Sequence, residues 1–391
     1  MRVLISTTAN EGHFGPLVSL GRAATSRGHE VRVAAPASFA ESVRRAGFEH
    51  LPFADAPPEL IGPVMARLPT LPFHEADATV VREVFGRIDA QAAFPGVQHA
   101  LDRWRPDVLV REPAEFGTLA AAERAGVPHL QVAIGMTELS RAVGALVADP
   151  LRDLSGIAGL PEDALGAGLA GELVLSPVPE LLDRAGDDRY DPTVVAFRYR
   201  DESPVVASGR TTLPSWGDPE LPLVYVTFGS VTGSLPPFAG VFRQALDGLA
   251  DLPVRVLLTV GRRVDVDGIG PVPPNARIES WVPQDRVLGE AALVLGHGGF
   301  GTTMGALAAG LPQVVAPIFT SDQIVNARHV AAVGAGRAVA AGADAPGRAC
   351  RTVTDVLADP RYRTGARAVA AAIAALPPVG EAMAVVERFA D

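Results

Sequence analysis

Apolar residues along this chain fall into short unbroken runs separated by longer stretches with helical spacing. Runs of this kind predict strands that are buried on both faces, as in a parallel sheet. In the first half of the chain they occupy residues 3–7, 31–35, 108–110 and 127–134. After a predicted loop at residues 8–15, a helix is predicted from Pro16 to a stop at Gly28. Such strand–helix–strand units wind into a doubly wound sheet.

The same pattern starts again in the second half of the chain. Residues 206–220, rich in Pro, Gly and charged side chains, form the predicted interdomain linker. Further strands are predicted at residues 223–228, 254–260, 277–280, 292–295 and 314–317. The predicted fold class is therefore α/β, with two Rossmann-like domains, residues 1–205 and 221–376, that face each other across a cleft. The last residues, 377–391, form a helix that could return to the N-terminal domain.

Residues 52–100 have little regular pattern. They carry several prolines and four aromatic side chains, which are Phe53, Phe73, Phe85 and Phe94. These aromatic side chains either pack in the core or line an apolar cleft, and the pattern leaves both open.

Composition narrows the class of protein. A length of 391 residues with 48% hydrophobic residues fits two globular domains. The net charge of −10 disfavours nucleic-acid and anionic-membrane partners, and no run reaches the roughly 18 apolar residues of a membrane span. Met1 leads directly into a strand, and Cys350 is the single cysteine. We therefore expect a cytoplasmic monomer or homodimer that binds neither nucleic acid nor membrane.

The clearest chemical signal is a glycine-rich turn after the predicted strand at residues 292–295. His297, Gly298 and Gly299 follow this strand, and a helix from Thr302 to a stop at Gly310 comes next. Glycines let the backbone approach a ligand closely, and the amides at a helix N-terminus favour anions. The turn therefore predicts a phosphate or diphosphate site, with packing alone as the other interpretation.

A second candidate lies after the first strand. The loop there does not match the G-x-G-x-x-G pattern of dinucleotide-binding proteins, but it carries His13. Open α/β sheets build their sites at the carboxyl ends of strands, so His13 is either a solvated loop residue or a proton acceptor. Together with a diphosphate cradle, it indicates transfer of a group from a phosphate carrier to a nucleophile.

A metal site is not expected. Asp265 and Asp267 form a D-x-D sequence, but they lie in a Gly- and Pro-rich loop that we interpret as solvated. The remaining histidines lack metal-ligand spacing and are expected at the surface or in packing; they are His29, His50, His74, His99, His129 and His329.

Five motifs in order resemble the GT-B nucleotide-sugar glycosyltransferases of family 1, in particular the actinobacterial enzymes that modify enediyne, polyketide and macrolide natural products. The motifs are Gly12-His13-Phe14-Gly15-Pro16-Leu17, Thr227-Phe228-Gly229-Ser230, Trp281-Val282-Pro283-Gln284, His297-Gly298-Gly299 with Gly301-Thr302-Thr303, and Asp322-Gln323. The resemblance covers essentially the whole chain.

The resemblance implies a role for each of these positions. Trp281 and Val282 would hold the base of the nucleotide and Gln284 would lie near its ribose. The implied diphosphate site is made of Ser230, His297, Gly298, Gly299, Gly301 and Thr302. Asp322 and Gln323 would meet the sugar hydroxyls. His13 would be the general base, and Phe14 would lie at the acceptor.

Two positions depart from the family pattern. Relatives carry an aspartate that orients the histidine, and here Glu112 stands in its place with Glu115 and Asp107 nearby. We prefer Glu112 as the partner of His13 and leave the other two open. Plant relatives carry a glutamate for the ribose where this chain has Gly305.

The implied reaction is inverting, metal-independent transfer of a sugar or deoxysugar from a dTDP- or UDP-sugar to a hydroxyl of a hydrophobic natural product. The nucleotide sugar is a co-substrate, and no further cofactor is expected. The alternatives are a catalytically silent auxiliary partner of a glycosyltransferase and a sugar-nucleotide epimerase of the same fold.

Overall fold

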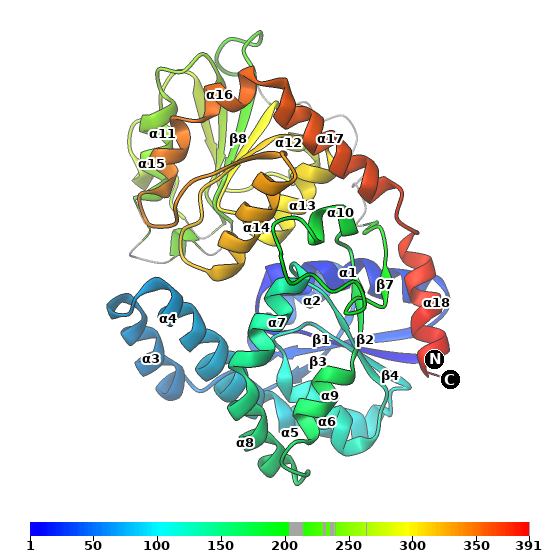
Figure 1. The fold of residues 1–391 in the computed structure, drawn as a ribbon. Helices are drawn as coiled ribbons and strands as arrows, with labels where there is room; N and C mark the ends of the chain where they lie inside the picture. Colours follow the sequence, from blue (N-terminus) through cyan, green and yellow to red (C-terminus); the bar gives the residue numbers. More distant parts are fainter. Residues whose placement is uncertain are drawn as a thin grey trace. The chain divides into compact units, whose positions relative to one another are not determined.

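The computed structural model describes residues 1–202, 213, 215–229, 232–234, 238, 240–262 and 264–390, apart from the side chains of Pro69 and Phe73. The chain divides into two compact units (Figure 1). Unit 1 comprises Met1–Val178, Arg189–Ser203 and Leu376–Asp391, and unit 2 comprises Pro179–Asp188 and Pro204–Ala375. The first unit thus differs from the predicted domain 1–205, because Pro179–Asp188 belongs to unit 2 and the C-terminal residues belong to unit 1. Most of the predicted linker, residues 206–212 and 214, lies outside the described residues.

Unit 1 is built on a seven-stranded sheet in the order β3-β2-β1-β4-β5-β6-β7. Each neighbouring pair is parallel. The strand order reverses between β1 and β4, which makes this the topological switch point of a doubly wound sheet. The strands are β1 Arg2–Ser6, β2 Glu30–Pro36, β3 Glu49–Phe53, β4 Val108–Arg111, β5 His129–Val132, β6 Leu173–Ser176 and β7 Phe197–Arg198.

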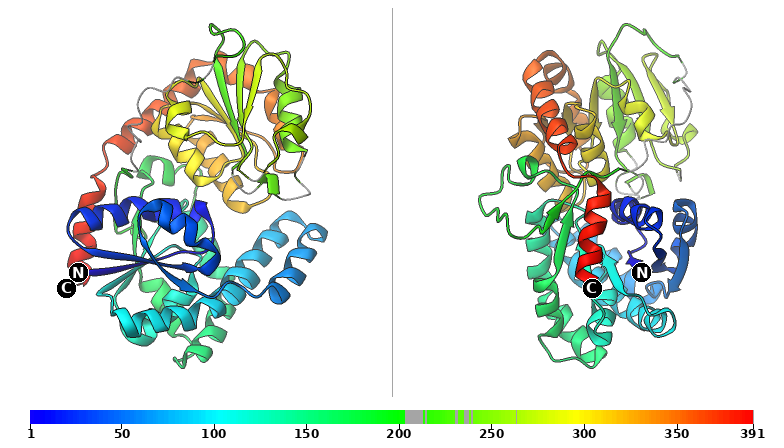
Figure 2. Two further views of the ribbon diagram at one scale, coloured as in Figure 1. Left: turned by 180° about the vertical axis from the view of Figure 1, so that it is seen from behind. Right: turned by 90° about the vertical axis from the view of Figure 1, so that its right-hand side faces the viewer.

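Helices cover both faces of this sheet (Figures 1 and 2). Strand side chains alternate between the faces, so Val3 and Ile5 pack on the side of α1, whereas Leu4 packs with α5 and α6. The helices are α1 Glu11–Ser26, α2 Ala40–Ala46, α3 Pro58–Arg67, α4 Phe73–Thr79, α5 Ala90–Trp104, α6 Phe116–Ala125, α7 Thr137–Leu146, α8 Ala148–Ala158, α9 Ala164–Gly171 and α18 Val379–Ala390, with short 3₁₀ turns at Ala37–Phe39 and Leu68–Thr70.

Unit 1 differs in two places from what the sequence pattern indicated. Residues 52–100 are largely helical, and they include a π-helix, η3, at Val80–Asp89 between α4 and α5. The helix predicted from Pro16 begins earlier, at Glu11, because the side chain of Asn10 accepts a hydrogen bond from the amide of Gly12 and caps the helix there. His13 consequently lies in the first turn of α1 rather than in a loop.

The C-terminal helix α18 packs on α1 within unit 1 (Figure 1). Its Glu387 accepts hydrogen bonds from Nε of Arg27 at 2.8 Å and from Nη2 of Arg27 at 2.6 Å. Nε2 of His29 lies 2.7 Å from the same carboxylate. These contacts hold the pKa of Glu387 at about 2, through the hydrogen bonds from Arg27 and His29 and their charges.

Unit 2 repeats the architecture with a six-stranded parallel sheet in the order β10-β9-β8-β11-β12-β13. Its switch point therefore lies between β8 and β11. The strands are β8 Leu223–Thr227, β9 Arg255–Thr259, β10 Ala276–Glu279, β11 Leu293–Gly296, β12 Gln313–Val315 and β13 Gly336–Ala338. The predicted fold class, α/β with two Rossmann-like domains, is confirmed.

The helices of unit 2 again cover both faces of the sheet. Val224 and Val226 of β8 pack against α11 and α15, whereas Leu223 and Tyr225 pack against α12 and α13. The helices are α10 Glu180–Asp183, α11 Val241–Leu249, α12 Gln284–Leu288, α13 Phe300–Ala308, α14 Ser321–Ala332, α15 Ala345–Cys350, α16 Val353–Ala358 and α17 Pro360–Ala374, with 3₁₀ turns at Thr232–Ser234 and Asp267–Ile269.

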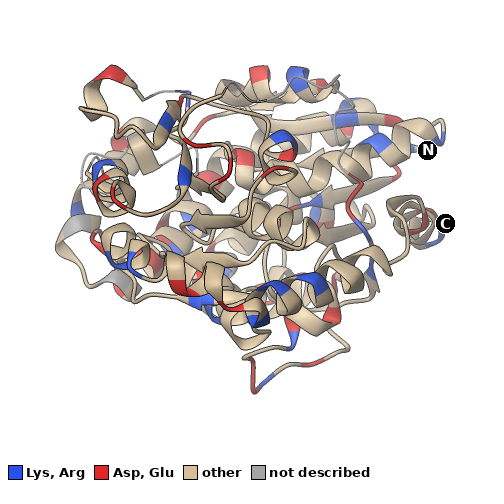
Figure 3. Cartoon of the chain, turned by 90° about the horizontal axis from the view of Figure 1, so that it is seen from above, with Lys and Arg blue, Asp and Glu red and all other residues tan. Residues whose placement is uncertain are grey.

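Charged side chains of both signs are spread over the described part of the chain. Arginines are interspersed with aspartates and glutamates along the helices (Figure 3). Within the part of the chain that the structure describes, no helix has the length and apolar character needed to cross a membrane.

Candidate active site

His13 and Glu112 meet at the switch point of unit 1. Ser6, the last residue of β1, lies in register with Arg111, the last residue of β4, so the residues that follow the two strands come together. Nδ1 of His13 lies 3.2 Å from Oε1 of Glu112 and 3.1 Å from Oγ1 of Thr8. A ring that carries its proton on Nδ1 donates to this carboxylate, which makes Nε2 the basic nitrogen.

Glu112 is held as a carboxylate although it is fully buried. Burial on its own would raise its pKa, but the adjacent His13 and two backbone amides outweigh this effect and lower the pKa below its usual value. The amides belong to Thr8, 3.2 Å from Oε1, and Ala114, 2.6 Å from Oε2. The carboxylate is therefore charged and fixed in position at neutral pH.

The other two candidate partners of His13 have different roles in the structure. Glu115 is the N-cap of α6, where it accepts from the amide of Thr118 at 2.9 Å and from Oγ of Ser6, also at 2.9 Å. Asp107 lies at the opposite end of β4 and accepts from the amide of Arg2 at 2.6 Å. Of the three carboxylates left open by the sequence, Glu112 is the one beside the imidazole.

The π-helix adds two groups near His13: Phe85, one of the four aromatic residues left open by the sequence, and Asp89, which the sequence did not reveal. The ring of Phe85 lies 5.6 Å from the ring of His13, centroid to centroid. Asp89 lies one turn further along η3, and its charge interacts with Glu115, Glu112, His13 and Asp55. Burial and the neighbouring carboxylates raise the pKa of Asp89 to about 7. A π-helix at this point fits the frequent occurrence of such segments at functional sites.

Phe14 was expected at the acceptor, and the structure contradicts this. Its side chain is 2% exposed and packs edge-on against Phe39 and Phe48 in the core on the α1 side of the sheet. The reason is helical geometry: the residue after His13 is turned about 100° around the helix, toward the sheet. Phe53 and Phe94 also belong to the core, and the side chain of Phe73 lies outside the described residues.

In unit 2, His297 is enclosed by glycines at the second switch point. Gly296 of β11 lies in register with Thr227 of β8, so the residues after both strands meet. A Cβ atom on Gly229 would lie 2.8 Å from Nε2 of His297, and one on Gly299 would lie 2.5 Å from it. Gly229 also has a positive φ of 80°. The glycines are thus required to seat the imidazole, which the sequence pattern alone did not reveal.

The environment keeps His297 neutral. Burial lowers its pKa to about 4, against a small opposing effect of the carbonyl of Thr227. Nδ1 of His297 is buried and has no partner with hydrogen-bond geometry among the described residues. An orphaned polar atom of this kind fits a site that is completed by a ligand. Ser230, expected beside it, lies outside the described residues.

The glycine turn leads directly into α13. Gly299 is the N-cap of this helix, and no side chain of the described residues caps it. The first-turn amides, including those of Gly301 and Thr302, have no partner inside the helix. Asn326 of α14 donates through Nδ2 to the carbonyl of Gly298 at 2.7 Å and fixes the turn. This supporting residue lies outside any motif in the sequence.

The remaining donor candidates lie around the same turn. Nε2 of Gln284 donates to Oγ1 of Thr302 at 2.9 Å, which ties α12 to α13. Asp322 lies in the first turn of α14 and is half-buried. Oε1 of Gln323 accepts from the amides of Ile318 and Phe319 at 2.7 and 3.2 Å. The oxygen of Gln323 is therefore already engaged in holding the loop before α14.

Trp281 is 50% exposed after β10, and its neighbour Val282 packs at the edge of the α12–α13 core. The guanidinium of Arg262 lies 4.0 Å from the centroid of the Trp281 ring system. One face of the indole is thus covered by a cation. The nucleobase that is predicted to contact Trp281 would therefore meet a ring that also contacts Arg262.

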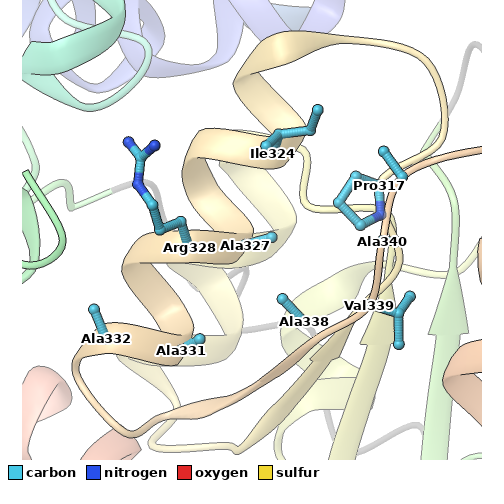
Figure 4. Close-up of a pocket in the computed structure, with 10 residues that line it drawn as sticks. Pro317, Ile324, Ala327, Arg328, Ala331, Ala332, Ala338, Val339 and Ala340 are labelled. Atoms are coloured by element: carbon cyan, nitrogen blue, oxygen red, sulfur yellow. The ribbon is translucent and has the colours of Figure 1, made fainter. Parts of the chain in front are cut away.

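A cavity of about 580 Å³ lies elsewhere in unit 2, between α14 and the segment from β13 to Ala341. Figure 4 shows Ile324, Ala327 and Ala331 of α14 on one side and Pro317 and Val339 on the other. None of the predicted donor residues lines it. The described His, Cys, Asp and Glu residues, including Asp265 and Asp267, form no group of three or more that could hold a metal.

Two histidines outside the candidate site, His329 and His50, bond to backbone carbonyl groups. His329 is fully buried, and its Nδ1 donates to the carbonyl of Leu182 at 2.8 Å. Nε2 of His50 donates to the carbonyl of Ala35 at 3.0 Å.

Both halves of the chain match known proteins. The N-terminal and C-terminal domain models of the erythromycin biosynthesis protein CIII-like family match residues 22–208 and 243–389. The L-demethylnoviosyl transferase of Streptomyces niveus is 31% identical over 345 residues, which cover 86% of this chain and 84% of that protein. TDP-daunosamine transferase DnrS of Streptomyces peucetius is 28% identical, over 100% of this chain and 97% of that protein.

The fold has solved counterparts. The glycosyltransferase VinC, in complex with dTDP, is similar with a TM-score of 0.76 and 22% identity, over 100% of this chain and 99% of VinC. The family matches extend over both units of the chain. The chain therefore belongs to the EryCIII-like natural-product glycosyltransferases, which are GT-B enzymes of glycosyltransferase family 1.

Proposed function

We propose that this glycosyltransferase moves a sugar from a dTDP-sugar to a hydroxyl group of a hydrophobic natural product, with inversion at the anomeric carbon. The observation that carries the proposal is the His13–Glu112 pair at 3.2 Å. An alcohol or phenol has too high a pKa to attack unassisted at neutral pH, and a histidine beside a buried carboxylate is suited to take its proton.

The reaction balances with the groups described above. The acceptor oxygen forms a bond to the anomeric carbon while the bond from that carbon to the diphosphate oxygen breaks. The proton of the acceptor passes to Nε2 of His13, and Glu112 stabilises the imidazolium that forms. The electron pair of the broken bond leaves with the nucleoside diphosphate. A single displacement of this kind inverts the configuration.

The diphosphate is assigned to the turn at His297 in unit 2. The orphaned Nδ1 of His297 and the uncapped N-terminus of α13 support this assignment. We propose that these donors stabilise the leaving group without a divalent cation. Trp281 and Val282 would contact the base, Gln284 the ribose, and Asp322 and Gln323 the sugar; for Gln323 this leaves only its amide nitrogen.

The choice of dTDP over UDP rests on relatives. DnrS is named as a transferase of TDP-daunosamine, and its alignment with this chain covers the full length. The acceptor is proposed to be apolar because Phe85 lies directly against the ring of His13.

Thermal unfolding with dTDP, UDP, GDP and NAD, in buffer with EDTA, tests the donor assignment. A ligand at about one hundred times its dissociation constant stabilises the protein by about 2.7 kcal/mol. We expect dTDP to raise Tm most and NAD not at all, and His297→Ala to abolish the shift. An absence of any shift with both pyrimidine diphosphates would overturn the donor site. A second measurement follows the hydrolysis of a dTDP-sugar. An enzyme should slowly release dTDP from this donor, whereas a silent auxiliary protein should not.

A further inference from the structure

Arg111 forms a buried ion pair with Glu172. It is the last residue of β4, and its side chain is fully buried. Nε of Arg111 donates to Oε1 of Glu172 at 2.7 Å, and Nη2 donates to Oε2 of the same carboxylate. A planar guanidinium fork matches a carboxylate in this bidentate way, which a lysine cannot reproduce.

Glu172 is itself fixed by further contacts. It lies between α9 and β6 and accepts from Nδ1 of His129 at 2.8 Å and from Nε2 of Gln131 at 3.0 Å. Burial alone would raise the pKa of Glu172, but the charge of Arg111 and these hydrogen bonds hold it at about 2. The carboxylate is therefore a permanent charge that keeps the guanidinium in one orientation.

The third nitrogen of Arg111 is directed at the loop that carries Glu112. Nη1 donates to the carbonyl oxygens of Glu112 at 3.1 Å, Pro113 at 3.2 Å and Glu115 at 3.4 Å. The ring of Phe116 lies over the guanidinium, 5.6 Å from Cζ. One buried cation thus gathers the carbonyl groups of the turn between β4 and α6.

The same turn holds the side chain that faces His13. Arg111 donates hydrogen bonds to the backbone carbonyls of this turn. The carboxylate of Glu112 accepts hydrogen bonds from the amides of Thr8 and Ala114. We propose that Arg111 is a positioning residue: anchored on Glu172, it fixes the turn so that Oε1 of Glu112 stays against Nδ1 of His13. This inference rests on the proposed function of His13 as the base.

The variant Arg111→Lys tests the proposal because it keeps the buried positive charge but loses the fork. NMR titration of the His13 imidazole is the first readout. With Glu112 displaced, we expect the titration midpoint of His13 to move to lower pH by about half a unit or more. Steady-state kinetics are the second readout, with kcat expected to fall roughly ten-fold while the donor KM stays within about two-fold.

A matched control changes the same network at its outer end. Glu123 contacts Nε2 of His129 at 3.0 Å, and Glu123→Gln leaves the Arg111–Glu172 pair in place. We expect the His13 midpoint of this variant to match the wild type. An equal shift in Glu123→Gln would mean that any disturbance of the buried network has this effect, and would overturn a specific role of Arg111.

A double-variant comparison shows whether Arg111 acts through Glu112. If it does, Arg111→Lys combined with Glu112→Gln has the same kcat as Glu112→Gln alone. Multiplicative losses, or a folded Arg111→Lys variant with an unshifted His13 midpoint, would overturn the proposal. Should Arg111→Lys fail to fold, the neutral pair Arg111→Gln with Glu172→Gln removes both buried charges together, and the same midpoint shift is expected. The NMR readout does not depend on turnover. If the protein released no nucleotide from any donor tested, the proposed function would be overturned, but the titration of His13 would still test the role of Arg111.

Discussion

Nδ1 of His13 lies 3.2 Å from Oε1 of Glu112, although the two residues come from widely separated parts of the chain. Parallel pairing of β1 with β4 brings them together, because Ser6 and Arg111 end the two strands in register. The pair stands at the switch point of the first sheet, where doubly wound proteins build their sites. This contact is the basis of the first prediction.

Replacing Glu112 with glutamine removes the charge that stabilises the imidazolium of His13. We expect kcat to fall roughly one-hundred-fold, within the range of general-base contributions, with dTDP-induced stabilisation unchanged. The acid limb of the pH–rate profile should move to lower pH, since the carboxylate favours the protonated ring. Asp107→Asn is the control, because Asp107 lies at the opposite end of β4, where its carboxylate accepts a hydrogen bond from the amide of Arg2. Equal losses in both variants would contradict the assignment.

Asp89→Asn should become more stable relative to wild type as the pH rises. The folded-state pKa of Asp89 is about 7, whereas the usual value is 3.8. The folded protein thus binds this proton more tightly than the unfolded chain, so the contribution of Asp89 to stability falls as pH rises from about 4 to about 7. At pH 8 the variant should be more stable than wild type by at least about 1 kcal/mol, the equivalent of roughly one pKa unit.

Urea unfolding at pH 5 and pH 8 measures this difference. The exposed Asp102 of α5 supplies the control variant Asp102→Asn, which should follow the wild-type curve. Parallel curves for Asp89→Asn and wild type would show that Asp89 ionises normally.

Gly299→Ala should disturb nucleotide binding through His297. The added Cβ would lie 2.5 Å from Nε2 of His297 and force the imidazole to move, so we expect the Tm shift with dTDP to be lost. Gly301→Ala adds the same methyl group two residues on, where no described atom lies within 4 Å. This variant should keep the wild-type Tm without ligand, and a normal dTDP response in Gly299→Ala would contradict the proposed seat of the imidazole.

Glu387→Gln should loosen the C-terminal helix. The folded-state pKa of Glu387 is about 2 against a usual 4.5, so its contribution to stability is complete above pH 4.5 and is lost as pH falls toward 2. Because the carboxylate is partly exposed to solvent, we expect a fall in Tm of only about 1–2 °C at pH 7. Hydrogen exchange in α18 should increase, whereas Glu381→Gln in the first turn of the same helix should leave it unchanged. A Tm difference that persists undiminished at pH 3 would argue against the ion pair.

Much of the fold follows from local pattern. Apolar runs marked the strands because a strand buried on both faces needs an unbroken apolar sequence, and Gly28 and Gly310 marked helix ends because each adopts a positive φ. Residues 52–100 gave no continuous signal because the chain there forms several short helical segments in succession, with a 3₁₀ turn after α3 and a π-helix between α4 and α5. A local rule fails where the local geometry itself is unusual.

By itself, the sequence determined the two doubly wound units and the glycine turn after β11, and it marked His13 as a candidate base, because these depend on the order of elements and on positions next to strand ends. Only the tertiary structure decided that Glu112 faces His13 while Glu115 caps α6, that Phe14 turns into the core, and that Asp89 and Phe85 join the site. It likewise decided that Arg111 reaches the turn after β4. These outcomes depend on which way side chains point from elements far apart in the sequence, and that direction is set by strand register and helix packing, which no single segment encodes.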